Sequence, residues 1–226
     1  MDKKKGILLV ALGTPRSCET EDVREYLKEF LGDPLVIQKP RWLWLPILNG
    51  IILKVRPQKS AEMYKQIWTD EGSPLMSYTI AQTEQLQELR EDFDVRFAMT
   101  YGEPRIDKVI REMKESGVED ITVLPLYPQY SLTTVEPIIQ QVKKIDDKIN
   151  VIRDFHQIES YTDLLAESIR EKWQANHYDK LILSYHGIPL SYITKKKDAY
   201  EVQCIKTTRL VVEKLGLKEE EYEHTY

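Results

Sequence analysis

Short apolar runs alternate with longer amphipathic stretches along the whole chain. Apolar runs of this length are typical of buried β-strands, and they lie at residues 7–12, 94–100, 120–126, 150–155 and 180–185, with a weaker one at 221–226. Nearly continuous apolar strands separated by helices are typical of parallel sheets that are covered on both faces. The pattern therefore predicts an α/β fold with parallel sheets.

Two of the intervening helices are marked at both ends. Thr20 is predicted to cap a helix that ends at Gly32, because its hydroxyl can accept a hydrogen bond from a free backbone N–H and glycine favours helix ends. Pro104 is predicted at the first position of a helix that ends at Gly117. The buried face of this second helix is a stripe at helical spacing, formed by Ile106, Val109, Ile110 and Met113.

A new alternation of strand and helix begins after residue 150. Four strand-type units precede this point, and Ser160 with Asp163 forms a capping-box pattern for a helix that follows it. We therefore expect a first domain over residues 1–152 and the N-terminal part of a second domain over residues 153–226.

Residues 42–53, with the sequence WLWLPILNGIIL, form a further apolar segment. Twelve residues with an internal Pro and Gly are too short to cross a bilayer, which needs about 20. Three interpretations stay open: a packed core helix, a segment that dips into a membrane interface, or a mobile apolar lip.

Composition and charge exclude several classes of protein. With 42% hydrophobic and 31% charged residues, the chain is unlike a disordered or collagen-like protein. The net charge is −5 and basic residues do not gather on one predicted face, so no nucleic-acid partner is expected. Cys18 and Cys204 form neither a CxxC pair nor a disulfide framework, which favours the reducing cytoplasm. The motifs GxGxxG, GxxxxGK[ST], GxSxG and HExxH are absent from the sequence.

Turn-forming and aromatic residues collect where the predicted strands end. The segments are LGTP at 12–15, YGEP at 101–104, YPQYS at 127–131 and SYHGIP at 184–189. Ligands of open parallel sheets bind outside the carboxyl ends of the strands. Because Tyr and Leu present apolar faces rather than charges, the implied ligand is flat and apolar. The plainer alternative is that every strand must end in a turn.

His186 is the strongest candidate for chemistry. It ends an apolar strand and is followed by Gly187, which permits close approach of a ligand to the backbone. An imidazole there could act as a base near neutral pH or bind a divalent metal; the alternative is a hydrogen-bonded core histidine. No carboxylate partner for a metal is identifiable by spacing. Among the other histidines, His177 is predicted to be exposed, His156 to be structural, and His224 lies in the weak last strand.

Taken together, several segments of the chain resemble the ferrochelatases, enzymes that insert ferrous iron into a porphyrin. The segments are LLVALGTP at 8–15, YLKEFLGDP at 26–34, RPQKSA at 56–61, IWTDEGSPL at 67–75, LPLYPQYS at 124–131 and SYHGIP at 184–189. The likeness runs in unbroken order from residue 6 to the end of the chain.

The resemblance implies two similar doubly wound domains that face each other across a porphyrin cleft, with residues 42–53 as an apolar lip. His186 matches the family's essential histidine, held to bind the metal or to take a pyrrole proton. The family's acidic partner of this histidine lies further along the chain, so the resemblance also implies a C-terminal truncation and an incomplete second domain. Other matching residues line the porphyrin pocket: Leu12, Arg56, Tyr101, Tyr127, Tyr130 and Ser131.

By the same resemblance, the expected function is that of a cytoplasmic lyase of heme biosynthesis with Fe²⁺ as its substrate metal. Leu132 stands where some members carry a cluster-binding cysteine, so no iron–sulfur cluster is expected. Members that act on coproporphyrin carry Tyr where this chain has Leu12, so the resemblance favours protoporphyrin IX as the porphyrin and protoheme as the product.

Two other hypotheses stay open. A non-catalytic porphyrin- or heme-binding protein on the same scaffold is motivated by the missing acidic half of the site. A sugar- or nucleotide-binding α/β protein is motivated by the strand–helix alternation alone. Loss of free-base porphyrin fluorescence in the presence of Fe²⁺ would distinguish the enzyme from both.

Overall fold

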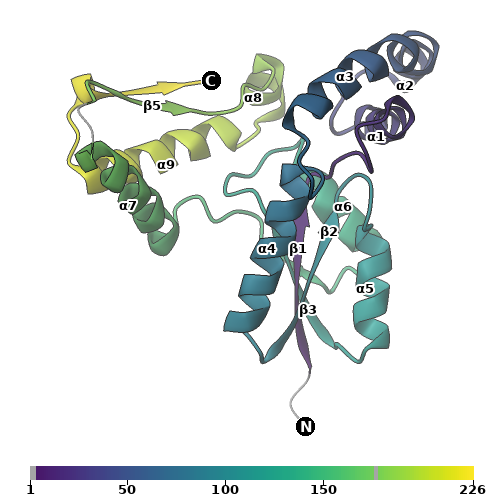
Figure 1. Ribbon diagram of the computed structural model, residues 1–226, viewed down its shortest axis with the longest axis horizontal. Helices are drawn as coiled ribbons and strands as arrows, with labels where there is room; N and C mark the ends of the chain where they lie inside the picture. The colour runs from purple at the N-terminus through teal and green to yellow at the C-terminus, as the bar shows by residue number, and fades with distance from the viewer. Residues whose placement is uncertain (1–3, 176–177) are drawn as a thin grey trace. The chain divides into compact units, whose positions relative to one another are not determined.

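The computed structural model describes residues 4–175 and 178–226. The chain divides into two compact units, which are Met1–Leu126 with Thr133–Arg153, and Tyr127–Leu132 with Asp154–Tyr226 (Figure 1). Each unit contains a parallel sheet of its own. The short segment Tyr127–Leu132 follows a strand of the first unit in sequence but packs with the second unit.

Within the described residues, the first unit is built on a four-stranded parallel sheet with the order β2-β1-β3-β4. Leu9 in β1 pairs with Phe97 on one side and with Leu124 on the other. Leu8 and Val10 have no exposed surface. The predicted α/β class with parallel strands is confirmed. The strands are β1 (Lys5–Ala11), β2 (Phe93–Met99), β3 (Asp120–Pro125) and β4 (Asn150–Val151).

Strand β4 is shorter than the predicted 150–155. The N–H of Ile152 still donates to the carbonyl of Val123 at 2.9 Å. The N–H of Phe155 donates instead to the carbonyl of Pro128 in the second unit, at 3.0 Å. The prediction was wrong at this end because the backbone changes its hydrogen-bonding partner after residue 152.

Helices cover both faces of this sheet. Helix α4 (Pro74–Leu89) precedes β2 and packs on β1 and β2. Helix α5 (Ile106–Glu115) connects β2 to β3, and α6 (Val135–Ile145) connects β3 to β4. Helix α5 packs on β1, β2 and α6. Figure 1 shows α4 and α5 on opposite sides of the sheet, which is the doubly wound arrangement.

Helix α5 has the predicted buried stripe but not the predicted start. It begins at Ile106 with Arg105 as the N-cap residue, so Pro104 lies outside it. The carbonyl of Pro104 accepts a hydrogen bond from the N–H of Met99 at 2.7 Å, which holds Pro104 at the end of β2. Gly117 follows the helix with a φ of 85°, as expected for a residue that ends one. The buried residues of α5 are Ile106, Val109, Ile110 and Met113.

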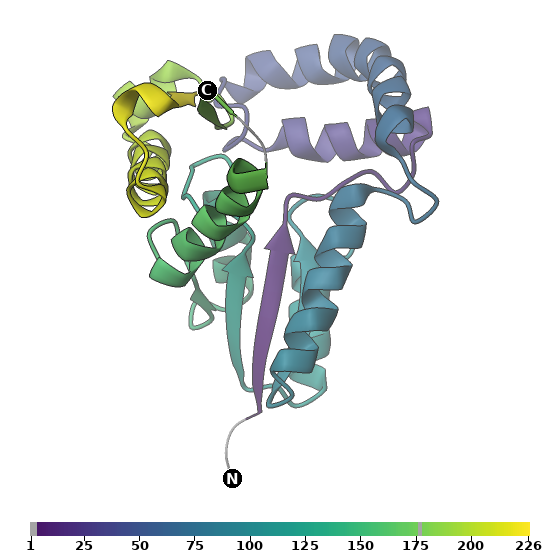
Figure 2. The same ribbon diagram turned by 60° about the vertical axis from the view of Figure 1, so that its left-hand side comes forward.

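Residues 42–53 lie in a helical stretch that packs beside helix α1, and Figures 1 and 2 show these helices beyond the carboxyl end of β1. Leu48 and Leu53 are buried against the inner face of α1, but Trp42 is 79% exposed and Ile51 is 61% exposed. The packed-core interpretation therefore holds only for the inner face. No helix of the described residues is long and apolar enough to cross a membrane. The elements are α1 (Thr20–Gly32), α2 (Arg41–Ile47), the π-helical turn η1 (Leu48–Ile52) and α3 (Leu53–Ile67).

The second unit contains a two-stranded parallel sheet in its described residues. Both strands match predicted runs, and helices α7 and α9 pack against each other. Cys204 and Val211 are fully buried, whereas Ile182 is 61% exposed, so the apolar core of this unit is small. The elements are α7 (Glu159–Ala175), β5 (Leu181–Ser184), α8 (Leu190–Lys196), α9 (Tyr200–Leu215), the 3₁₀ turn η2 (Glu219–Glu221) and β6 (Tyr222–Thr225).

Two predicted helix caps are wrong. Thr20 is the first residue of α1, and its N-cap residue, Glu19, makes no side-chain cap. The hydroxyl of Ser17 instead accepts from the N–H of Glu19 at 3.1 Å and donates to Asp22 at 2.6 Å. Helix α7 begins at Glu159, so Ser160 lies within its first turn and cannot be the cap of a capping box.

Candidate functional site

The ends of β1 and β2 meet in a turn that only glycine can form. Gly13 has a φ of 107°, and a Cβ atom there would lie 1.7 Å from the carbonyl oxygen of Tyr101. The N–H of Tyr101 donates to the carbonyl of Leu12 at 2.9 Å. Two of the predicted pocket residues, Leu12 and Tyr101, are therefore brought together by the backbone.

Helix α1 holds the segment that follows β2. The hydroxyl of Tyr101 donates to Asp33 at 2.9 Å, and the N–H of Gly102 donates to Glu29 at 2.9 Å. The guanidinium of Arg105 also binds Glu29, at 2.7 Å. Tyr101 is only 2% exposed and packs in the same apolar cluster as the inner face of α1. In this arrangement the Tyr101 hydroxyl is already committed to a carboxylate.

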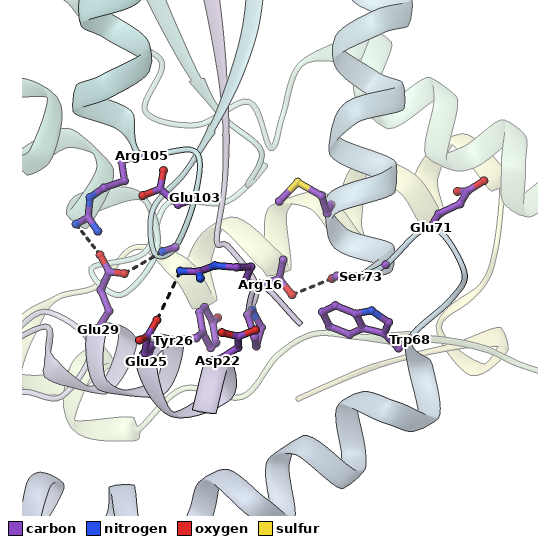
Figure 3. Close-up of a pocket in the computed structure, with 15 residues that line it drawn as sticks. Arg16, Asp22, Glu25, Tyr26, Glu29, Trp68, Glu71, Ser73, Glu103 and Arg105 are labelled. Atoms are coloured by element: carbon purple, nitrogen blue, oxygen red, sulfur yellow. Dashed lines mark hydrogen bonds and ion pairs between the residues drawn. The ribbon is translucent and has the colours of Figure 1, made fainter. Parts of the chain in front are cut away.

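A cavity of about 410 Å³ lies at this edge of the sheet (Figure 3). Its wall contains aromatic and polar groups, and some of the polar groups are paired with one another. The hydroxyl of Thr14 donates to Ser73 at 2.9 Å, and Arg16 lies 3.7 Å from Glu25. Burial raises the pKa of the Tyr26 phenol, so this group stays neutral at physiological pH. The side chains labelled in the figure are Arg16, Asp22, Glu25, Tyr26, Glu29, Trp68, Glu71, Ser73, Glu103 and Arg105.

The sequence predictions and this cavity overlap only in part. The residues that line it in the described chain do not include Leu12, Tyr101 or Arg56, and Arg56 is exposed on α3. Trp68 and Ser73 were not predicted as site residues. The signal that could have found them is the motif IWTDEGSPL at 67–75, which carries part of the family resemblance.

The second unit holds the predicted segment after β3. The N–H of Tyr130 donates to the side-chain oxygen of Gln203 in α9, at 2.6 Å. The hydroxyl of Ser131 donates to Asp198 at 2.9 Å, and Asp198 is only 4% exposed. Tyr130 and Ser131 are themselves buried, and Tyr127 is partly buried.

His186 lies at the carboxyl end of the other sheet. The N–H of Tyr185 donates to the carbonyl of Thr225 at 2.9 Å, so the pairing of β5 and β6 extends to the residue before the histidine. His186 and Gly187 are exposed, and a Cβ atom on Gly187 would lie 3.9 Å from the Cβ of Tyr226. The imidazole is therefore accessible, and the neighbouring Gly187 lies close to Tyr226, which follows β6. In the described part of the chain, no group of three or more His, Cys, Asp or Glu side chains is arranged to hold a metal ion.

Two further histidines have structural surroundings. His156 is 6% exposed, and its Nδ1 lies 2.8 Å from Asp154. The ring of His224 stacks on Tyr185 with a centroid distance of 4.9 Å, and its Nδ1 lies 2.8 Å from the hydroxyl of Thr208. Burial lowers the pKa of His224 from its ordinary value. The prediction for His177 lies outside the described residues.

The model of the ferrochelatase family matches residues 4–226. The chain belongs to the ferrochelatase family. The predicted family and the predicted enzyme class, a ferro-lyase, are thereby confirmed, as is the fold class. Cys18 is partly buried and Cys204 is buried, and both are free cysteines.

Three relatives show how similar this ferrochelatase-family chain is to known members. It is 98% identical over 226 residues to the coproporphyrin III ferrochelatase of Lactococcus lactis subsp. cremoris (strain SK11), covering 100% of this chain and 71% of the relative. It is 89% identical to the coproporphyrin III ferrochelatase of Lactococcus lactis subsp. lactis (strain IL1403), covering 100% and 72%. It is 43% identical over 231 residues to the ferrochelatase of Vibrio cholerae, covering 99% and 72%.

The names of the two Lactococcus relatives speak against protoporphyrin IX, the substrate that the sequence predicts from the family pattern at Leu12. That prediction rested on one position of a pocket to which many residues contribute. Leu at position 12 therefore occurs in a ferrochelatase-family chain whose close relatives are named for coproporphyrin III.

Proposed function

We propose that this protein inserts Fe²⁺ into coproporphyrin III, with both as substrates. The observation that carries the proposal is the 98% identity over all 226 residues to a relative named coproporphyrin III ferrochelatase. In this reaction one Fe²⁺ enters the ring and two pyrrole protons leave it, so the charge balances. The protein must therefore supply a group that accepts protons beside an apolar surface that holds the ring.

We propose that His186 either accepts a pyrrole proton or binds the metal. A neutral imidazole accepts a proton near physiological pH and is also a ligand that ferrous iron accepts. Its exposure at a strand end, next to Gly187, leaves room for a flat ligand to approach. This geometry supports the role, which rests on the family resemblance.

The proposed porphyrin contacts are of two chemical kinds, basic and uncharged. Arg56 is exposed on α3 between Lys54 and Lys59, which are also exposed. Coproporphyrin III carries more carboxylates than protoporphyrin IX, so a basic stretch of this kind suits it better. The remaining contacts rest on the family resemblance, and three of them, Tyr101, Tyr130 and Ser131, are buried in this structure. The other two are Leu12 and Tyr127.

The test compares the two porphyrins. This chain and the full-length relative from L. lactis subsp. cremoris are each given Fe²⁺ with coproporphyrin III or protoporphyrin IX, and the loss of free-base fluorescence is followed without oxygen. We expect faster loss with coproporphyrin III. Faster loss with protoporphyrin IX would overturn the substrate, and a spectral shift on binding without metal insertion would favour the non-catalytic binding protein.

We also propose that residues 42–53 make peripheral contact with a membrane surface. The supporting observation is the exposure of Trp42 and Ile51 on the outer face of α2 and η1. Lys54 follows directly, is exposed, and would attract anionic lipid. Co-sedimentation with anionic vesicles is expected for the wild type and is expected to fall for Trp42→Asp; no co-sedimentation of either protein would contradict the contact.

A further inference from the structure

Two segments of the second unit carry proposed site residues, and the start of helix α9 lies against both. One segment is Tyr127–Leu132 and the other is the stretch that begins at His186. Three residues at or just before the first turn of α9 make these contacts: Asp198, Tyr200 and Gln203. None of the three was singled out as a site residue from the sequence.

Asp198 fixes the backbone of the first segment. Its Oδ2 accepts hydrogen bonds from the hydroxyl of Ser131 and the N–H of Leu132, both at 2.9 Å. Its Oδ1 accepts from the N–H of Tyr200 at 3.1 Å. A buried carboxylate is tolerated when donors satisfy it, and all three of these donors are uncharged. The carboxylate therefore connects the segment directly to the start of α9.

Gln203 makes a second, independent connection one turn further along. Its Oε1 accepts from the N–H of Tyr130 at 2.6 Å. The side chain of Gln129 reaches the same helix, where its amide donates to Thr207 at 3.0 Å. Each of residues 129–132 is therefore hydrogen bonded either to α9 or to Asp198, which precedes the N-cap residue of that helix.

Tyr200 connects the same helical turn to the catalytic candidate. Burial raises the pKa of its hydroxyl, and the backbone of His186 opposes this shift, which places the hydroxyl close to that backbone. The neighbouring carbonyl, that of Glu201, accepts from the hydroxyl of Tyr226 at 3.4 Å. The helix start therefore lies close to the backbone of His186 and is hydrogen bonded to Tyr226.

We propose that Asp198, Tyr200 and Gln203 are positioning residues for iron insertion, which together hold the porphyrin-contacting segment Tyr130–Ser131 and the backbone of His186 on one rigid helix start. The inference rests on the proposed function. Because displacing a reacting group by about 1 Å can cost roughly 100-fold in rate, a shared support of this kind has a direct effect on turnover.

The positions of these residues predict different kinetic effects. Tyr200→Phe removes only the hydroxyl that reaches His186, so we expect a fall in kcat of about tenfold with the KM for coproporphyrin III within about twofold. Asp198→Ala and Gln203→Leu release the porphyrin-contacting segment, so we expect the KM to rise by about tenfold. Gln203→Glu keeps an acceptor for the N–H of Tyr130 and is expected to stay near the wild type.

The variants are made at the equivalent positions of the full-length L. lactis subsp. cremoris relative and in this chain, with Tyr178→Phe and Asp179→Asn as matched controls on exposed residues. Thermal unfolding is measured for each. The kcat effect at Tyr200, the KM effect at Gln203 and its rescue by Glu would support the inference. It is overturned if the variants keep wild-type kinetics, or if activity falls only in step with the unfolding temperature.

Failure of the proposed function gives a different result. In that case the wild-type relative and the wild-type chain would metallate neither porphyrin, and the inference would fall with the function. An active wild type whose Tyr200→Phe, Asp198→Ala and Gln203→Leu variants behave like it overturns the positioning role alone.

Discussion

Gly13 shows how a single residue determines the geometry at the edge of a sheet. Its backbone has a φ of 107°, and the space that a side chain would need is filled by the carbonyl of Tyr101. We expect Gly13→Ala to lower the free energy of unfolding by about 1–3 kcal/mol from backbone strain, with a further loss from the clash. Urea unfolding measures this loss. A matched Gly50→Ala variant, at an open helical position, is expected to be neutral or stabilising.

His224 predicts a pH dependence of stability near neutrality. Burial lowers the pKa of the folded imidazole, so below the unfolded value of about 6.5 the unfolded chain binds a proton that the folded chain does not. The stabilising effect is complete above that pH and is lost as the pH falls through it towards the folded pKa. The facing groups are Tyr185, Thr208, Tyr226 and Glu201, and among them only the charge of Glu201 opposes the shift.

The measurement is the thermal midpoint at about pH 7.5 and about pH 5.5. We expect the wild type to lose stability between the two values and His224→Leu to lose markedly less. An equal loss in both proteins would show that other groups cause the pH dependence.

The sequence predicted some roles of single residues correctly and others wrongly. The apolar stripe of α5 follows from helical spacing, because burial repeats with the helix period. The caps at Thr20 and Ser160 and the helix start at Pro104 were wrong, because several hydrogen-bonding side chains lie near each helix start and only tertiary packing selects among them. Asp198 could not be found, since its partners lie more than 60 residues earlier in the chain.

Helix α5 gives the clearest prediction at the scale of an element. Ile110 has no exposed surface, whereas the next residue, Arg111, is exposed. We expect Ile110→Ala to reduce the free energy of unfolding by about 2–5 kcal/mol, because it leaves a cavity between the helix and the sheet. Arg111→Ala is expected to change it by less than about 0.5 kcal/mol. Urea unfolding measures the loss of free energy of unfolding in both variants. Equal losses would contradict the packing of α5 on the sheet.

The elements themselves were largely predicted, and the exceptions have physical causes. The strands of both sheets lie within a residue or two of the apolar runs, because buried parallel strands are apolar on both faces. The predicted run at 150–155 gave only a two-residue strand, because the backbone then bonds to Pro128. The outer face of residues 42–53 is exposed although it is apolar, which no hydrophobic pattern can distinguish from a core helix.

At the scale of the whole molecule, the two units differ in how much apolar surface they bury. Among the described residues, the sheet of the first unit is covered by helices on both faces, whereas Ile182 and Leu190 of the second unit are 61% and 74% exposed. The domain boundary expected near residue 152 did not include the segment Tyr127–Leu132, which packs with the second unit. A local pattern does not reveal such a long-range assignment.

We therefore expect the second unit to unfold at a lower urea concentration than the first. Trp173 is the only tryptophan in the sequence of the second unit, so its fluorescence reports on that unit. A variant in which the other tryptophans are replaced by Phe reports on the second unit alone. The variant Trp173→Phe reports on the first unit alone. Coincident transitions in the two proteins would show one cooperative unit instead. The other tryptophans are Trp42, Trp44 and Trp68.

The function was predicted to the level of the family but not of the porphyrin. Long motifs in unbroken order identify the ferrochelatase family, which the family match confirms. The name of the Lactococcus relative speaks against protoporphyrin IX, which was predicted from the single position Leu12. The roles of His186 and of the proposed porphyrin contacts stay predictions.

The most direct measurement is the rate of Fe²⁺ insertion into coproporphyrin III by His186→Ala, compared with the wild type in the full-length relative and in this chain. Because His186 is exposed, the substitution is expected to leave the thermal midpoint unchanged. Loss of a positioned proton acceptor predicts a fall of roughly 10²–10⁴-fold in kcat. A variant that folds normally and keeps the wild-type rate would contradict the role of His186.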